Sequence, residues 1–139
     1  MGKRILVADD SRTIQQAFAM VMDGSGYSVL FAKSVDEALA VAKQDGRPDL
    51  VLADVGLGNG SGYDLCAELK ADAVLRDTPV FILASAQSPY DEARGRKVGA
   101  DGYGRDAKDA LAVCEQLMAG EQKPPLPQPL LVNALLSAD

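Results

Sequence analysis

Four mostly hydrophobic runs recur along the chain, and stretches with hydrophobic residues at helical spacing separate them. The runs cover residues 4–8, 28–32, 50–54 and 79–85, and residues 101–105 are a weaker candidate for a last strand. Short continuous hydrophobic runs are typical of strands that are buried on both faces of a parallel sheet. The pattern therefore predicts five parallel strands.

Capping residues mark the starts of several intervening helices. Ser34 and Glu37 have the spacing of a capping box, and Ser88 before Pro89 predicts a helix that begins at the proline. Strands that alternate with helices are joined by right-handed crossovers, which place helices on both faces of the sheet. The predicted fold class is therefore α/β, a doubly wound parallel sheet of five strands with the flavodoxin-like order 2-1-3-4-5.

The chain of 139 residues has the size of one domain and is long enough to bury an ordinary core. We assign this domain to residues 1–120. Residues 121–139 differ in composition, because a proline-rich stretch precedes a short apolar segment, and we predict a linker there in preference to a polyproline ligand. The apolar segment has three interpretations: it packs on the domain, pairs with a second copy, or leads into an output domain.

Charge and residue usage exclude several classes of function. With 14 Lys and Arg against 20 Asp and Glu, the net charge of -6 argues against direct binding of nucleic acid. The absence of histidine excludes histidine-based acid-base catalysis and zinc sites that need imidazole. The N-terminus has neither a secretory signal nor a membrane span, so we expect a cytoplasmic protein with no membrane partner. Cys66 and Cys114 are interpreted as small buried hydrophobic residues.

Carboxylates follow two of the predicted strands. Asp9 and Asp10 come directly after the first strand, and Asp54 ends the third. Each of them taken singly is explained by helix capping or turn formation. In the order 2-1-3-4-5, however, the first and third strands are neighbours, so the three carboxylates converge where ligands bind in open α/β sheets. Crowded carboxylates favour a bound cation such as Mg²⁺, and a carboxylate can attack phosphorus, which suggests phosphoryl transfer onto Asp54.

The order of these motifs resembles that of a response-regulator receiver domain of bacterial two-component signalling. The resemblance covers roughly residues 3 to 119 and depends on an ordered set of motifs. These are ILVADDS at 5–11, PDLVLAD at 48–54, GY at 62–63, PV at 79–80 and GADGY at 99–103.

This resemblance implies a set of roles for the residues at the predicted site. Asp54 is the phosphoacceptor for a partner histidine kinase or phosphotransfer protein, and the chain is not itself an enzyme. Asp9 and Asp10 hold Mg²⁺ together with Asp54, and the backbone carbonyl of Gly56 is a further ligand. Tyr103 matches the aromatic switch position on the fifth strand.

The sequence also departs from the family's pattern. Ala84 stands where the family has a Thr or Ser that hydrogen-bonds the phosphoryl group, although Ser85 is adjacent. Neighbouring strand residues point to opposite faces, so Ser85 substitutes only if the strand end is kinked or bulged. Asp106 stands where the family has a lysine. We do not expect Arg105 or Lys108 to replace that lysine, because of their predicted positions on the strand and in the helix.

Two hypotheses follow from these matches and departures. The favoured one is a phosphorylatable receiver with atypical switching, because the acceptor and both acidic metal ligands are present. The alternative is a pseudo-receiver that keeps the fold and acts as a protein–protein interaction scaffold without phosphorylation. A metal-dependent phosphohydrolase is disfavoured by the absent lysine and by the lack of a visible substrate pocket.

The resemblance also implies a partner surface, formed by the fourth helix, the fifth strand and the fifth helix. It contacts an output domain, a partner protein or a second copy in a homodimer. The residues predicted on it are aromatic or basic on an otherwise acidic chain: Tyr90, Arg94, Arg96, Lys97, Tyr103, Arg105 and Lys108. They predict an acidic partner, while the alternative is a solvated surface with charges matched to the helix dipole.

Overall fold

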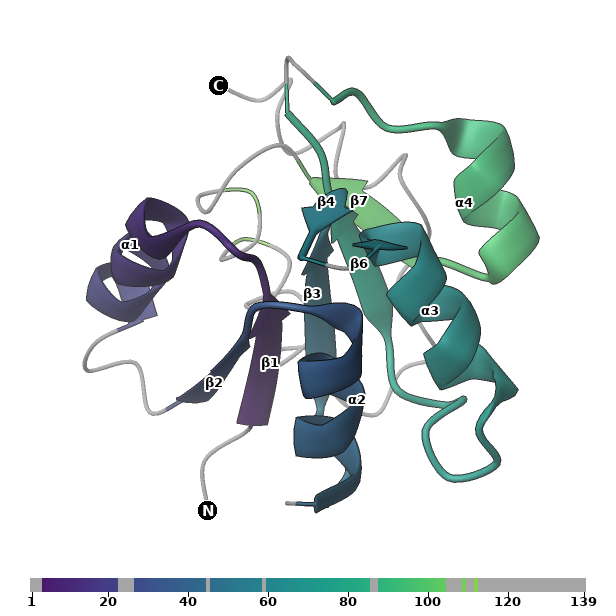
Figure 1. The fold of residues 1–139 in the computed structure, drawn as a ribbon, viewed down its shortest axis with the longest axis horizontal. Helices are drawn as coiled ribbons and strands as arrows, with labels where there is room; N and C mark the ends of the chain where they lie inside the picture. Colours follow the sequence, from purple (N-terminus) through teal and green to yellow (C-terminus); the bar gives the residue numbers. More distant parts are fainter. Residues whose placement is uncertain are drawn as a thin grey trace.

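The computed structural model describes residues 4–22, 27–44, 46–58, 60–85 and 88–104, with residues 109 and 112. Its main sheet is parallel and has the strand order β2-β1-β3-β6-β7 (Figure 1). The predicted order is confirmed, because β6 and β7 are the fourth and fifth strands of that sheet. The elements are β1 Arg4–Ala8, α1 Arg12–Met22, β2 Ser28–Ala32, α2 Val35–Gln44, β3 Leu50–Asp54, β4 Gly56–Leu57, β5 Gly60–Ser61, α3 Gly62–Ala71, β6 Val80–Leu83, α4 Glu92–Val98 and β7 Gly102–Gly104.

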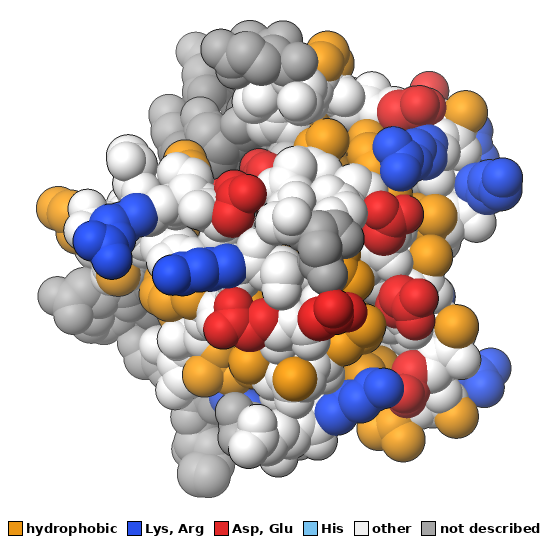
Figure 2. Space-filling model, in the orientation of Figure 1, with side chains coloured by type: hydrophobic (Ala, Val, Ile, Leu, Met, Phe, Trp, Pro, Cys, Tyr) orange, Lys and Arg blue, Asp and Glu red, His pale blue; other side chains and the backbone are white. Residues whose placement is uncertain are grey.

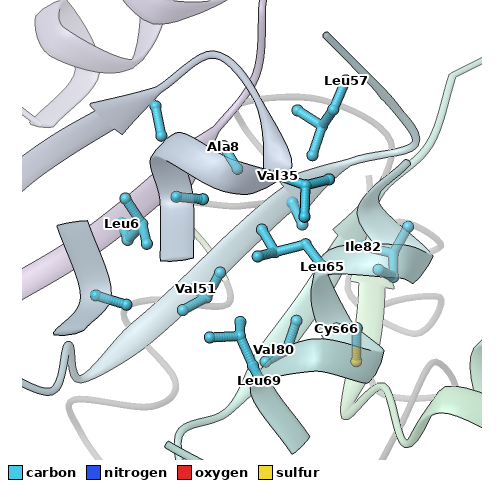
Figure 3. Close-up of a cluster of buried hydrophobic side chains, with 14 of the residues drawn as sticks. Leu6, Ala8, Val35, Val51, Leu57, Leu65, Cys66, Leu69, Val80 and Ile82 are labelled. Carbon is cyan, nitrogen blue, oxygen red and sulfur yellow. The ribbon is translucent and has the colours of Figure 1, made fainter. Parts of the chain in front are cut away.

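The two faces of the sheet contribute to separate hydrophobic clusters, because successive strand residues point in opposite directions. One cluster joins Leu6, Val51 and Val80 to residues of α2 and α3. Figure 3 shows Leu65 and Leu69 of α3 lying against the sheet in this cluster. The other cluster joins alternate residues of the same strands to Phe18 of α1, which is fully buried. The sheet is therefore covered on both faces, as the continuous hydrophobic runs predicted.

Cys66 lies within the first cluster and is fully buried, which confirms the prediction that it acts as a small hydrophobic residue. Burial raises the pKa of its thiol to about 12, so the thiolate is scarce at neutral pH. Cys114, residues 105–108 and the predicted tail 121–139 lie outside the described residues.

The start of α4 differs from the prediction that a helix begins at Pro89. The N-cap is Asp91, whose carboxylate accepts the backbone N–H of Arg94 at 3.0 Å. Ser88 instead forms a turn, in which its N–H donates to the Ser85 hydroxyl oxygen at 3.1 Å. An ionised side chain at the N-cap also interacts favourably with the helix dipole. The predicted start at Pro89 is therefore wrong.

Two short strands, β4 and β5, pair in an antiparallel manner just after β3. They place Ser61 at the N-cap of α3, where Ser61 and Asp64 form a capping box. The first residue of α3, Gly62, is thereby held directly against the end of β3. Within the described ranges, no helix is both long enough and apolar enough to cross a membrane.

Candidate functional site

Asp9 directly follows β1, and Asp54 is the last residue of the adjacent strand β3. The pairing of β1 with β3 ends with Ala8 opposite Ala53, so the next residues of the two strands are the two aspartates. The Asp9 N–H donates to the carbonyl of Ala32 at 2.9 Å, which extends the pairing of β1 with β2 by one residue. The strand order thus brings these two carboxylates to neighbouring strand ends, where an open α/β sheet binds its ligands.

The carboxylates affect one another's ionisation. Asp9 is 2% exposed, and burial raises its pKa to about 6, with further raising by the charges of Asp54 and Asp10. The Ser11 N–H, 2.9 Å from Asp9 Oδ1, opposes that shift. Burial also raises the pKa of Asp54, as does the charge of Asp10, whereas the hydrogen bond from the Gly56 N–H lowers it. Asp10 itself is exposed.

The chemistry of this acidic cluster, Asp9, Asp10 and Asp54, fits a hard divalent cation. Among the residues that the structure describes, no three Asp, Glu, Cys or His side chains are arranged to hold a metal ion. Mg²⁺, however, usually needs only one or two carboxylates, with water and phosphate oxygens completing its shell. Burial and, to a smaller extent, the charges of Asp54 and Asp10 raise the pKa of Asp9, and a nearby cation would oppose both effects. The Gly56 amide bonds to Asp54 Oδ2 at 2.9 Å, while the role of its carbonyl stays a prediction.

The loop after Asp54 is fixed by backbone contacts that the sequence reasoning missed. The Gly58 N–H donates to the Lys33 carbonyl at 3.1 Å, and the Gly62 N–H donates to the Val55 carbonyl at 3.1 Å. A Cβ atom on Gly62 would lie 2.5 Å from the Asp54 carbonyl oxygen, so only glycine fits there. The Gly58-Asn59 dipeptide was the available signal, because Gly-Asn between two short strands is typical of a two-residue hairpin turn.

The residues after β6 leave no strand hydroxyl at the position that matches the family's Thr or Ser. Ala84 is buried, and its N–H donates to the Gly104 carbonyl at 2.7 Å, so it continues the pairing with β7. Ser85 is exposed, and its hydroxyl oxygen accepts the Ser88 N–H. Asp106, the residue at the family's lysine position, lies outside the described residues.

Three tyrosines form a contiguous row from α3 to β7. Tyr103 of β7 stacks on Tyr90, with ring centroids 4.1 Å apart and an interplanar angle of 7°. Tyr90 in turn contacts Tyr63 of α3, with a centroid distance of 6.1 Å. Burial raises the pKa of Tyr90 to about 12, and neighbouring acidic groups, Tyr63 first among them, add to the shift. Tyr90 was predicted on a partner surface, and these ring contacts were not predicted from the sequence.

Arg94, which was also predicted on the partner surface, contacts the chain itself. Its guanidinium carbon lies 4.5 Å from the centre of the Tyr63 ring, within the range of a cation–π contact. Its Nη2 donates to the Ser61 hydroxyl at 3.3 Å and lies 3.8 Å from Asp64 Oδ1. These contacts tie the start of α4 to the start of α3.

The chain is similar to known signalling domains. Residues 5–104 match the model of the response regulator receiver domain family. The chain is 36% identical over 103 residues to the phosphate regulon transcriptional regulatory protein PhoB of Pseudomonas aeruginosa, a match that covers 74% of the chain and 44% of PhoB. It is 33% identical to the protein PilG of the same organism, over 73% of the chain and 75% of PilG.

Solved structures give the same result for the fold. The chemotaxis response regulator CheY4 of Vibrio cholerae has a TM-score of 0.74 and 27% identity, with 84% of the chain and 99% of CheY4 covered. The signal receiver domain of a signal transduction histidine kinase from Syntrophus aciditrophicus has a TM-score of 0.74 and 28% identity, with 86% and 92% covered.

We predict that Asp9→Asn makes the stability of the metal-free protein less dependent on pH. Because the folded pKa of about 6 lies above the ordinary 3.8, the contribution of Asp9 is fully present below 3.8 and is lost as the pH rises through about 6. Asparagine keeps an acceptor for the Ser11 N–H. Between about pH 4 and pH 7, the wild type should lose about 1 to 3 kcal/mol of unfolding free energy that the variant retains.

Urea denaturation in the presence of a chelator, followed by circular dichroism, measures this difference. Asp77→Asn is the matched control, because Asp77 is exposed in the segment between α3 and β6. If the unfolding free energy depends on pH equally in the wild type and in Asp9→Asn, the surroundings of Asp9 do not disfavour its charged form.

Proposed function

Because the chain belongs to the response regulator receiver family, we propose that it accepts a phosphoryl group on Asp54. The observation that carries this proposal is the placement of Asp9 and Asp54 at neighbouring strand ends, with Asp10 close enough to raise the pKa of both. Receiver domains work with histidine kinases and output domains in two-component signalling. The chain has no histidine, so a phosphohistidine donor belongs to another protein or domain.

In the proposed reaction, a carboxylate oxygen of Asp54 attacks the phosphorus of a phosphohistidine or of a small acyl phosphate. A bond from phosphorus to this oxygen forms while the bond to the donor nitrogen or oxygen breaks, and the donor leaves with that electron pair. The Gly56 N–H, 2.9 Å from Asp54 Oδ2, orients the attacking carboxylate. The product is an aspartyl phosphate, so the chain acts as an acceptor and not as an enzyme that turns over a substrate.

Mg²⁺ is the cofactor that we propose for this step, with Asp9 and Asp10 as the side chains that hold it. When bound, it supplies positive charge that offsets the negative charge of the carboxylates and of the phosphoryl oxygens. Asp54 must be ionised to attack, and a cation beside it favours that form. The Gly56 carbonyl is the backbone ligand that completes this proposal.

The second candidate function is that of a pseudo-receiver, a scaffold that docks partners without phosphorylation. It is favoured by the absence of a hydroxyl at Ala84 and by the acidic residue at position 106 in the sequence. Losing one donor aimed at developing charge typically costs about 2.7 to 4 kcal/mol of transition-state stabilisation. A loss of that size slows phosphorylation and leaves the acceptor in place, so the phosphorylatable receiver stays the first choice.

We predict that incubation with a small acyl phosphate and Mg²⁺ adds the mass of one phosphoryl group to the protein. Asp54→Asn should abolish this gain, because an amide oxygen is a poor nucleophile toward phosphorus. Asp77→Asn should keep it, since this exposed carboxylate belongs to the segment between α3 and β6. Intact-protein mass spectrometry measures all three.

The two candidate functions give opposite results in this experiment. A gain that is lost only in Asp54→Asn supports the receiver. No gain in the wild type, with no uptake of Mg²⁺, supports the pseudo-receiver, and turnover of a phosphate ester would support a phosphohydrolase.

We predict that Ala84→Ser accelerates phosphorylation, because it restores a hydroxyl after β6 at the position where Ala84 continues the pairing with β7. A hydrogen bond to a charged group contributes about 1.5 to 3 kcal/mol, so the rate should rise by about tenfold or more. Ser85→Ala is the matched variant and should leave the rate unchanged, since the Ser85 hydroxyl belongs to the turn with Ser88. A rate that falls in Ser85→Ala would show that Ser85 takes over the missing role.

The surface formed by α4 and β7 is the face that we propose for an output domain, a partner protein or a second copy in a homodimer. On the face drawn in Figure 2, acidic and basic side chains are interspersed and form no continuous basic stripe. This distribution and the net charge of -6 support a protein partner and no direct nucleic acid. We also propose a cytoplasmic location, where histidine kinases present their phosphohistidine.

We predict that charge reversal at Arg96 and Lys97 weakens binding to this partner. Both are basic residues in the last turn of α4 and are exposed, whereas Arg94 contacts Tyr63 and Ser61 within the chain. Steered association with an acidic surface should slow by about tenfold or more at low salt. Binding kinetics with the partner kinase or output protein, or sedimentation for a homodimer, measure the change. Equal association rates for the wild type and the reversed variant would remove the proposal.

A further inference from the structure

The start of α3 rests directly on the backbone of the phosphoacceptor position. Gly62 is so close to the Asp54 carbonyl that a Cβ atom would lie 2.5 Å from its oxygen. The Gly62 N–H also donates to the Val55 carbonyl at 3.1 Å. Tyr63, the next residue, therefore takes its position from the backbone that carries Asp54, and any displacement of that backbone displaces Tyr63.

Tyr63 is in turn bound to the start of α4. Its hydroxyl accepts the N–H of Asp91 at 2.8 Å, and Asp91 is the N-cap of α4. The Arg94 guanidinium covers the Tyr63 ring and donates to Ser61 at 3.3 Å. The two helix starts are thus joined by contacts to the hydroxyl and to the ring face of Tyr63, and these contacts hold Asp91 against the start of α3.

Tyr90 completes the connection to β7. Its ring is stacked flat on Tyr103 at 4.1 Å, and its hydroxyl lies where a side chain at Gly95 would have its Cβ atom. The absence of a side chain at Gly95 therefore lets Tyr90 lie against α4 while it contacts both Tyr63 and Tyr103. Stacked aromatic pairs contribute a favourable interaction beyond the area that they bury.

We infer that Tyr90 is a positioning residue that couples the Asp54 loop to Tyr103 through ring contacts, in place of the hydroxyl that Ala84 lacks. The coupling runs from the Asp54 backbone through Gly62 to Tyr63, from Tyr63 to Tyr90, and from Tyr90 to Tyr103. This inference rests on the proposed function, since it describes how phosphorylation of Asp54 reaches the face formed by α4 and β7.

Fluorine NMR of protein labelled with 3-fluorotyrosine tests the coupling, because the chain has only 4 tyrosines and no tryptophan. The first arm uses no phosphodonor. Tyr63→Phe removes the acceptor of the Asp91 N–H, and it should shift the resonance of residue 103. The same substitution should leave that resonance unchanged when Tyr90 is replaced by leucine. Tyr27, which packs on the other hydrophobic cluster, is the internal control.

The second arm adds the acyl phosphate and Mg²⁺ and records the mass gain on the same samples. Phosphorylation should move the Tyr103 resonance in the wild type and in Tyr90→Phe, which keeps the ring. It should not move that resonance in Tyr90→Leu, although the mass gain stays the same. A merely structural role of Tyr90 would not separate Tyr90→Phe from Tyr90→Leu in this response while both remain folded and phosphorylated.

The outcomes separate this inference from the proposed function. The coupling would be overturned if phosphorylation shifted the Tyr103 resonance equally in Tyr90→Leu and in the wild type. It would also be overturned if the wild type gained the phosphoryl mass with no shift of that resonance. The absence of a mass gain in every sample would instead overturn the proposed function. In that case the first arm still decides the coupling: a shift of residue 103 that depends on Tyr90 supports it, and a shift independent of Tyr90, or none, refutes it.

Discussion

Burial of carboxylates at the ends of adjacent strands, together with the repulsion among them, is the constraint on which the proposed chemistry of this protein depends. The in-register pairing of β1 with β3 makes Asp9 and Asp54 neighbours, and burial keeps water from screening them. The sheet core, covered on both faces, holds the strands in that register. The fold thus maintains a cluster of carboxylates whose charged forms are unfavourable alone and would be stabilised by a cation.

Under the proposed function, the departures from the family's pattern affect both the rate of phosphorylation and its transmission to β7. Ala84 removes a hydrogen bond to a charged group, a contact of about 1.5 to 3 kcal/mol. The tyrosine row that leads to Tyr103 consists of ring contacts of about 0.5 to 1.5 kcal/mol each. Because each ring contact is weaker than the hydrogen bond that it replaces, the coupling between Asp54 and β7 should be smaller than in a receiver that has the hydroxyl. In this proposal, atypical switching means a weaker coupling between Asp54 and β7.

Much of the fold follows from the sequence because buried parallel strands leave a strong local signal. The runs at 4–8, 28–32 and 50–54 gave the bounds of β1, β2 and β3. The start of α4 was mispredicted, because Ser88-Pro89 and Asp91 both have the local pattern of a helix start. A tertiary contact decides between them, since the Asp91 N–H donates a hydrogen bond to the Tyr63 hydroxyl. The stacking of Tyr90 on Tyr103 could not be predicted from the local sequence pattern either. It depends on the absence of a side chain at Gly95, which leaves room for the Tyr90 ring.

Calorimetric titration of the protein with Mg²⁺ near pH 6, repeated in two buffers of different ionisation enthalpy, tests the acidic cluster most directly. Asp9 is about half protonated there, because burial raises its pKa to about 6. Mg²⁺ should therefore bind with release of roughly half a proton from Asp9. Asp9→Asn should lose this part of the release and keep any part that comes from Asp54, whose pKa burial also raises. Absence of binding heat in both buffers, or binding with no proton release, would contradict the account of a cation held by mutually repelling carboxylates.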